Sequence, residues 1–535
     1  MIASLACATL AALAATEGEP LARVSTVQVA RGETISDAAI VDVDRDGEAD
    51  LVVASAAGAR RRVAVHLRRE GTPAFVSAPD RAVDLPDDVV AFACADVDAP
   101  PGREIVLLSA SGAYAWRPEA SEQEGRFARL VACDLLWQAV AAGDAFDWQE
   151  GVVDLDGDGL DDLVLPRPGA WRVALQRRGE AGAPGGAAPR FDEGFDLPVP
   201  DDLPGAGGGE LFDADRVEVR RPGGGQAVRV RFGGGGITFA ATDRARAPLL
   251  RVAEGTLAPR AHDWDGDGDL DLLALGAREM IVFVQEPRGR FDAARAVRLA
   301  SPVVRERSRE LDVSFGARSL DLDLDRRADC VFFAGDRRAK EPRTQALVYL
   351  NARRAPGQGA PPELPLFGAE GAPEQLLVIA GFARPLRFAD VDGDGSQDLA
   401  AVSVQPDLID ELRSAASERI DAELYVWKNL GRGFSRKPDL VRRISIPASD
   451  SEYTADFVGD ATGDGTADLL LREGRDRLAL YATRRSRDGL SVDERAAWEI
   501  AIAPEAVLLL PSRLGPGNGD LFVVEEGEVL CASFR

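Results

Sequence analysis

Aspartates recur at one fixed spacing along this chain of 535 residues. Counting the first Asp of each copy as offset zero, further Asp residues stand at offsets two, four and eight, and Gly usually stands at offset five. Carboxylates at alternating positions of a tight turn point to the same side, and Gly permits the sharp bend that brings them together. The spacing therefore predicts loops that each wrap around one cation, with the backbone carbonyl at offset six as a further ligand.

Six copies follow this pattern closely, and a seventh is degenerate. In the first copy the expected ligands are Asp42, Asp44, Asp46, the carbonyl of Glu48, and Asp50. The same five offsets give the expected ligands of the other copies: Asp154, Asp156, Asp158, Leu160 and Asp162; Asp263, Asp265, Asp267, Asp269 and Asp271; Asp321, Asp323, Asp325, Arg327 and Asp329; Asp390, Asp392, Asp394, Ser396 and Asp398; and Asp460, Thr462, Asp464, Thr466 and Asp468. The degenerate copy keeps Asp96, Asp98 and Glu104 but has Pro100 where the third Asp is expected.

Calcium is the cation that these loops are expected to bind. It takes six to eight oxygen ligands, whereas magnesium keeps several waters and demands near-octahedral geometry. An EF-hand does not fit, because its closing Glu stands at loop position twelve between two helices, and here the closing carboxylate comes at position nine and leads into an apolar run. The remaining alternative is an Asp-rich turn without metal, in which three or four carboxylates would repel one another. We expect about five to seven Ca²⁺ ions.

Charge and composition exclude several classes of function. The chain has 89 Asp and Glu against 63 Lys and Arg, a net charge of −26, so it lacks the basic surface of a nucleic-acid-binding protein. Two histidines, His66 and His262, are too few for a His-rich metal centre. No G-x-S-x-G nucleophile motif accompanies the adjacent His262 and Asp263, so we expect no catalytic residue and a protein that is not an enzyme.

Strands must hold these loops in place. Offsets nine to eleven are apolar in each copy, as in Leu51, Val52 and Val53, which predicts a short strand buried on both faces. Offset one is apolar in most copies, which predicts that each loop inserts one side chain into the core: Val43, Leu155, Trp264, Leu322 and Val391.

The loops recur at a period that suits the blades of a β-propeller. They start at residues 42, 96, 154, 263, 321, 390 and 460, and most intervals have room for four short strands, the size of one blade. We expect an all-β propeller over residues 22–535 with eight four-stranded blades, and seven as the alternative. The interval from 154 to 263 is about twice the others, which indicates an insertion around residues 200–250 or a ninth blade without metal. A second insertion is expected at residues 405–423.

The two ends of the chain are expected to share one blade. Asp520–Val524 and Glu528–Cys531 resemble strands one and two of a blade whose calcium loop has decayed into Leu514–Gly519. Val24–Val29 and Ile40–Val41 resemble strands three and four. Pairing of these strands would close the ring and remove exposed sheet edges.

Residues 1–15 are expected to form a signal peptide. Their apolar run is too short to span a bilayer, and Ala12, Leu13 and Ala14 fit an A-x-A cleavage site, although no Lys or Arg precedes the run. No other segment approaches about 18 uninterrupted apolar residues. We therefore expect an exported protein without a transmembrane segment, located in the periplasm, at the cell surface or outside the cell.

These motifs resemble the FG-GAP/VCBS repeat family, the calcium-loop β-propellers related to the head domain of integrin α subunits. The matching residues are the D-x-D-x-D-G-x-x-D loops, the strands that follow them, and the phrase from Val426 to Phe434 (VWKNLGRGF). The resemblance covers residues 22–535 and implies calcium-binding loops on a propeller. Members of the family often have seven blades, and eight here is a departure.

The expected function is binding without catalysis. We expect an adhesion module that binds a protein or a glycan at one face of the propeller. The first alternative is an enzyme similar to the calcium-dependent polysaccharide lyases, which would place carboxylate, Arg, Lys or Tyr groups in the central cleft. The second alternative is a purely structural module of a surface assembly. A cluster of carboxylates with Arg or Tyr at the propeller axis would favour the enzyme, and a Trp-lined face would favour binding.

Overall fold

A computed structural model describes most of the chain between residues 21 and 534. The described residues are 21–58, 60–69, 75–86, 89–98, 102–109, 111–118, 126–133, 147–148, 151–167, 170–178, 190–199, 259–275, 279–287, 289–300, 313–336, 342–351, 373–404, 419–447, 455–474, 476–487, 489–504, 506–509 and 520–534. The predicted signal peptide, the predicted insertion at 200–250 and the loop Leu514–Gly519 lie outside them.

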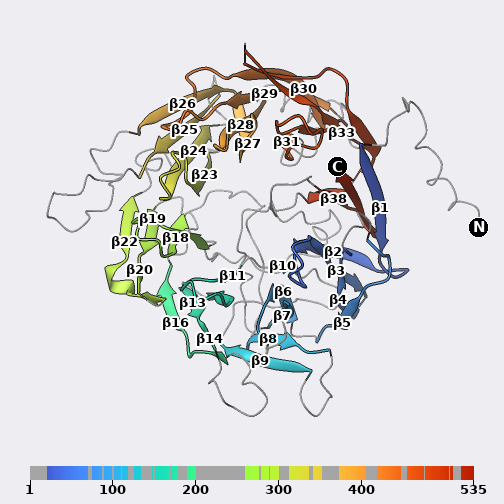
Figure 1. Ribbon diagram of the computed structural model, residues 1–535, viewed down its shortest axis with the longest axis vertical. Helices are drawn as coiled ribbons and strands as arrows, with labels where there is room; N and C mark the ends of the chain where they lie inside the picture. Colours follow the sequence, from blue (N-terminus) through green and yellow to red (C-terminus); the bar gives the residue numbers. More distant parts are fainter. Residues whose placement is uncertain are drawn as a thin grey trace, which may run out of the picture.

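Eight antiparallel sheets form a ring, the arrangement of an eight-bladed β-propeller (Figure 1). Seven blades follow one another along the chain. Their strands, from the first to the fourth of each blade, are β2 (Thr34–Val41), β3 (Asp50–Ala57), β4 (Arg60–His66) and β5 (Arg81–Asp84) in blade 1; β6 (Val89–Ala95), β7 (Glu104–Ser109), β8 (Gly112–Trp116) and β9 (Phe127–Ala132) in blade 2; β11 (Val152–Val153), β12 (Asp162–Arg167), β13 (Ala170–Ala174) and β16 (Phe195–Pro198) in blade 3; β17 (Pro259–His262), β18 (Asp271–Leu275), β19 (Glu279–Phe283) and β22 (Val297–Ala300) in blade 4; β23 (Val313–Leu320), β24 (Asp329–Asp336), β25 (Arg343–Tyr349) and β26 (Gln375–Ala380) in blade 5; β27 (Phe382–Ala389), β28 (Asp398–Val404), β29 (Arg419–Trp427) and β30 (Leu440–Pro447) in blade 6; and β31 (Ala455–Phe457), β32 (Leu469–Arg472), β33 (Arg477–Tyr481) and β36 (Trp498–Ala501) in blade 7.

Smaller elements decorate this ring. The strand β10 (Asp147–Trp148) pairs in parallel with β6, which makes blade 2 five-stranded. Three two-stranded ribbons extend blades 3, 4 and 7: β14 (Gln176–Arg177) with β15 (Arg190–Phe191), β20 (Gln285–Glu286) with β21 (Arg290–Phe291), and β34 (Thr483–Ser486) with β35 (Gly489–Val492). A 3₁₀ helix, η3, spans Ala293–Arg295. None of the helices in the described residues is long and apolar enough to cross a membrane.

The eighth blade joins the two ends of the chain, as expected. It contains β37 (Val507–Leu509), β38 (Asp520–Val524), β39 (Glu528–Phe534) and, as its outer strand, β1 (Ala22–Gln28). In Figure 1 the blue β1 lies beside the red C-terminal strands, and the two ends pair antiparallel from Ala22 with Phe534 to Gln28 with Glu528. Each end therefore supplies hydrogen bonds that the other would lack at an open sheet edge.

The positions of these terminal strands within the blade differ from the prediction. Because β37 pairs with β38 as the first strand, β38 and β39 are the second and third strands and β1 is the fourth. Ile40 and Val41 belong to β2, the first strand of blade 1, and not to the closing blade. Residues 419–423, the end of the insertion predicted at 405–423, lie in β29, and residues 405–418 lie outside the described part of the chain.

Buried side chains between adjacent blades form the core. The second strand of each blade is packed between two neighbours, which explains its uninterrupted apolar run; Leu51, Val52 and Val53 are all fully buried. The offset-one side chains are at most 1% exposed, which confirms that the loops insert them into the core. Trp264, for example, packs with Leu273 of its own blade and Cys330 of the next. Burial of one such large apolar side chain is worth about 1.5–3 kcal/mol.

Candidate metal centres

Each predicted cation loop joins the first strand of a blade, at the inner edge of the ring, to its second strand (Figure 1). The loop that begins at Asp42 follows β2 and leads into β3, and the other five intact loops occupy the equivalent place in blades 3 to 7. The apolar run that follows each loop is therefore the second strand of its blade. The prediction that this run is the first strand of a blade is wrong. Both ends of each loop are held in place, because the strands before and after the loop are packed into the core.

Five of the predicted loops bring three carboxylates together. In each group one oxygen from each residue lies within 4.8 Å of the others. Two oxygens that share one calcium ion at 2.3–2.6 Å are at most about 5 Å apart. The groups, which could each hold a metal ion, are Asp42, Asp44 and Asp50; Asp154, Asp156 and Asp162; Asp263, Asp265 and Asp271; Asp321, Asp323 and Asp325; and Asp390, Asp392 and Asp398.

The first Asp of each loop shapes the turn. The two carboxylate oxygens of Asp42 accept hydrogen bonds of 3.1 Å from the backbone N–H groups of Asp46 and Gly47. The carboxylate of Asp46 accepts a hydrogen bond of 2.8 Å from the N–H of Glu48. The loops of blades 3, 5, 6 and 7 repeat this pattern. The blade 4 loop differs only in that Gly266, at offset three, donates to Asp263 in place of the residue at offset four. The carbonyls at offset six remain predicted ligands.

Two positions of the turn require left-handed backbone. At offset five φ is positive, which Gly47 adopts without steric cost at 92°. Arg326 occupies the same offset at 74°, and Arg45 occupies offset three at 60°. A side chain in this conformation costs roughly 1–2 kcal/mol. The loop that contains Arg326 therefore keeps its shape although Gly is lost.

The closing Asp at offset eight is a buried anchor. In the loop of blade 4, Asp271 accepts a 2.7 Å hydrogen bond from the N–H of Trp264 and another from the N–H of Gln285. The equivalents in blades 1, 3, 5 and 6 also receive one N–H from their own loop and one from the second residue after the third strand. Burial, together with the smaller effect of the neighbouring charge of Asp265, raises the pKa of Asp271 to about 7. Burial likewise raises the pKa of Asp162 and Asp329 to about 7 and of Asp50 and Asp398 to about 6.

Basic side chains lie against two of the five carboxylate groups. Lys428 forms an ion pair with Asp392, whose side chain is 0% exposed. Arg177 forms an ion pair with Asp156, whose side chain is 3% exposed. Oδ1 of Asp156 and both carboxylate oxygens of Asp392 are buried and have no hydrogen-bond partner within the described part of the chain. These two loops already contain a positive charge where a metal ion would bind.

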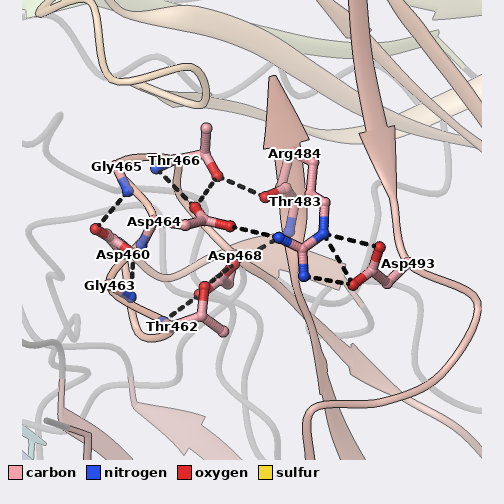
Figure 2. A network of polar contacts seen from close by, with 10 residues as sticks. All are labelled: Asp460, Thr462, Gly463, Asp464, Gly465, Thr466, Asp468, Thr483, Arg484 and Asp493. Carbon is pink, nitrogen blue, oxygen red and sulfur yellow. Dashed lines mark hydrogen bonds and ion pairs between the residues drawn. The ribbon is translucent and has the colours of Figure 1, made fainter. Parts of the chain in front are cut away.

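The two other predicted sites form no group of three carboxylates within the described ranges. In loop 460–468 the carboxylate of Asp464 faces Arg484, with Nη1 at 3.5 Å, and Arg484 also pairs with Asp493 (Figure 2). Thr462 at offset two supplies a hydroxyl in place of a carboxylate. Arginine thus supplies the positive charge beside this loop.

The degenerate loop 96–104 is also surrounded by arginine. Arg117 pairs with Asp98 through two nitrogens, and Nη1 of Arg45 lies 2.8 Å from Oδ2 of Asp96. The third predicted ligand, Glu104, accepts a 3.0 Å hydrogen bond from the N–H of Val97, and burial raises its pKa to about 7. Its structural role is therefore that of the closing Asp in the intact loops.

Side-chain amides connect the loops of adjacent blades. The amide of Gln285 in blade 4 donates a 2.7 Å hydrogen bond to the carbonyl of Leu155 in the blade 3 loop. Asn351 in blade 5 donates to the carbonyl of Trp264 at 2.7 Å, and Asn429 in blade 6 donates to that of Leu322 at 2.8 Å. Each of these residues also donates its backbone N–H to the closing Asp of its own blade. The result is a continuous hydrogen-bonded path through the four loops of blades 3 to 6.

Sequence reasoning missed these amides and the basic partners. The signal was present for Asn429, which lies in the phrase VWKNLGRGF, immediately after Lys428. Asn351 and Gln285 likewise follow the apolar third strand of their blades. Alignment of the blades on the second residue after the third strand would have revealed the amide, but not its contact with the neighbouring loop.

Comparison with known proteins identifies no family for this chain. No protein-family profile matches it, and no curated protein matches it. Similar solved structures include a Photorhabdus luminescens Tc holotoxin pore (16% identity, TM-score 0.30, covering 90% of this chain and 20% of that chain). They also include the AfRom2 CNH domain (10%, 0.28, 83% and 94%) and the V. cholerae biofilm matrix protein Bap1 (11%, 0.29, 97% and 92%). This chain thus spans about a fifth of the toxin chain. Likenesses this distant carry no argument about function.

Proposed function

We propose that this chain is an exported, calcium-binding β-propeller of the FG-GAP/VCBS type that binds a protein or glycan partner without catalysis. The observation that carries the calcium part is a group of three carboxylates in the equivalent loop of five blades, taken from offsets zero, two and eight in four of them and from offsets zero, two and four in blade 5. A cluster of three carboxylates that arose by chance would not recur at equivalent positions. Each group also lies in a turn whose backbone is already held by hydrogen bonds, so little reorganisation is needed to bind a cation.

Calcium fits the donor set better than magnesium does. The ligands available are carboxylates and backbone carbonyls, and a loop of this kind encloses the ion rather than leaving it coordinated mainly by water. Calcium tolerates six to eight oxygens in flexible geometry, which suits loops that differ at offsets two and six. Magnesium would demand ideal octahedral positions in each of five sequences.

Titration of the metal-free protein with Ca²⁺ and with Mg²⁺ tests this assignment. We expect saturable calcium binding by calorimetry and a rise of the melting temperature that grows with calcium concentration, because a ligand that binds only the folded state stabilises it. The variant Asp265→Asn removes one carboxylate of the blade 4 group, and Glu528→Gln changes a carboxylate that belongs to none of the five groups. Loss of one binding equivalent in the first variant only supports the proposal. An equal response to both cations contradicts it.

The partner-binding part is supported by the architecture. A closed ring of eight sheets presents many loops on a rigid scaffold, which is the usual arrangement of a binding module. Secretion of the full chain, followed by mass spectrometry of its N-terminus, tests export and cleavage near Ala14. Glycan arrays and affinity capture with calcium and with chelator test partner binding. Turnover of a polysaccharide by the purified protein would contradict the non-catalytic assignment.

A further inference from the structure

Three arginines occupy one register position on the first strands of adjacent blades. Arg260 of β17, Arg318 of β23 and Arg387 of β27 each stand three residues before the first Asp of their loop. They pair across the sheet with the equivalent residues Leu273, Val331 and Ala400 of the second strands. The same register position in β31, opposite Leu470, is Asp456. These residues therefore stand on the first strands of four successive blades, of which β23, β27 and β31 lie at the inner edge on one side of the ring (Figure 1).

The arginines are close enough to act on one another. The pKa of Arg318 is lowered to about 10 by burial and then by the positive charges of Arg260 and Arg387. Arg387 in turn lies beside Asp456, with Nε 3.5 Å from Oδ2. Among the four residues at this register position three are arginines and one, Asp456, is a carboxylate that pairs with Arg387, so the group carries an excess of positive charge in a chain whose net charge is −26.

Two of these arginines have no carboxylate partner within ion-pair distance among the residues that the structure describes. The Nη1 of Arg318 donates a 3.0 Å hydrogen bond to the carbonyl of Ala317, and no carboxylate lies near enough to pair with it or with Arg260. Like charges held together in a partly desolvated place destabilise the fold unless an anion compensates them. The remaining N–H donors are therefore available to a ligand.

The cluster is not required by the repeat itself. The equivalent residues of β2 and β6 are Ala39 and Ala93, which lie opposite Val52 and Val106. Both alanines are buried, so the propeller tolerates a small apolar residue at this position. The charge is a feature of blades 4 to 7 alone, which argues for a local role.

We propose that Arg260, Arg318 and Arg387 form an oxyanion-binding site at the inner edge of blades 4 to 6, for a ligand that carries a carboxylate or sulfate next to hydroxyl groups. Guanidinium donors match the planar oxygens of a carboxylate and also pair well with sulfate. Asp456 can accept a hydrogen bond from a hydroxyl and repels a second anion, so the arrangement favours an acidic sugar over a ligand that is negative throughout. The side chains of Arg387 and Asp456 are 31% and 22% exposed, which leaves them open to a ligand. This inference rests on the proposed function only in taking the partner to be a glycan.

Binding of glucuronate and of inorganic sulfate to the calcium-saturated full chain, measured by calorimetry, tests the site. Arg318→Gln keeps a polar side chain but shortens it and removes its charge, and Arg443→Gln on the outer strand β30 is the matched control, since Arg443 is 93% exposed. We expect Arg318→Gln to weaken binding by about tenfold or more, the loss of one charge-assisted hydrogen bond. Arg443→Gln should leave binding unchanged. Arg260→Gln gives the same test if the first variant does not fold.

The outcomes separate this inference from the calcium proposal. Calcium titration of the same variants reads the metal sites independently, so anion binding can fail while calcium binding is retained. Equal affinity of Arg318→Gln and the wild type, or no binding of either anion by the wild type, overturns the oxyanion site. Tighter binding of a pentaglutamate peptide than of an oligogalacturonate overturns the assignment to an acidic sugar.

Discussion

Replacement of Lys428 is expected to tighten calcium binding in blade 6. The ammonium group of Lys428 pairs with Asp392, one of the three carboxylates that could hold a metal ion there. A calcium ion and an ammonium group about 4 Å apart would repel by several kcal/mol even at an effective dielectric constant of about 20. Lys428 must therefore leave Asp392 when the metal ion binds, and its side chain, 21% exposed, has access to solvent.

The cost of that displacement sets the size of the effect. A close, partly buried charge pair is worth about 1.5–3 kcal/mol, the lower part of the range found for such pairs. Since 1.4 kcal/mol corresponds to a factor of ten, Lys428→Met should lower the calcium Kd of this loop by about 10-fold to 100-fold. The same substitution leaves the buried Asp392 with only the more distant Arg485, whose Nη1 lies 3.7 Å from Oδ2, so the metal-free variant should be less stable than the metal-free wild type.

Calcium calorimetry and urea unfolding, each with and without chelator, measure the two effects separately. Lys437→Met is the matched control. Lys437 is exposed in the turn that follows β29, and it is not paired with any of the five carboxylate groups. If Lys428→Met binds calcium no more tightly than the wild type, the reasoning that Lys428 competes with the metal is wrong.

Three further predictions follow from the packing and charge of the loops. Asn429→Ala should lower the free energy of unfolding by about 1–3 kcal/mol, because the buried carbonyl of Leu322 loses its hydrogen-bond donor. Urea unfolding measures this change. The control Leu430→Ala, at a side chain that is 68% exposed, should have almost no effect. Trp264→Ala should cost about 3–5 kcal/mol in the same assay, since Trp264 is fully buried between blades 4 and 5, and a cost below about 1 kcal/mol would contradict this packing. In the metal-free protein, stability should fall as the pH rises from 5 to 8. Burial raises the folded pKa of Asp162, Asp271 and Asp329 to about 7, above the ordinary value of an aspartate. The stabilisation that comes from the protonated form is therefore complete at low pH and is lost as the pH passes 7. Saturating calcium should remove this fall, and a metal-free stability that rises over the same pH range would refute the assignment.

Much of the fold could be predicted because the same pattern of loop and apolar strand recurs in several blades. The apolar residues at offsets one and nine to eleven specify a buried strand next to each loop, and the structure buries Val43 and Leu51 accordingly. Closure of the ring through both ends of the chain was also predictable, since a blade with only two or three strands leaves an open edge. The strand order within that blade was not, because Val507–Leu509 is too short to be recognised as a strand without its partner β38.

The acidic part of each site was predictable and its basic part was not. Asp42, Asp44 and Asp50 are close in sequence, so their spacing alone brings them together. Lys428 and Asp392 are separated by a strand, a long connection and a second strand, and only the paired sheet places them in contact. The arginines at the inner edge lie in three different blades, and no local pattern links them.

Metal content of the purified chain tests the central claim most directly. The protein is saturated with Ca²⁺, dialysed against calcium-free buffer with excess Mg²⁺, and analysed by elemental mass spectrometry against protein concentration. We predict about five equivalents of calcium at saturation, one for each carboxylate group, with the loops of blades 3 and 6 losing theirs first on dialysis. Fewer than about one equivalent at saturation, or complete replacement by magnesium, would contradict the account.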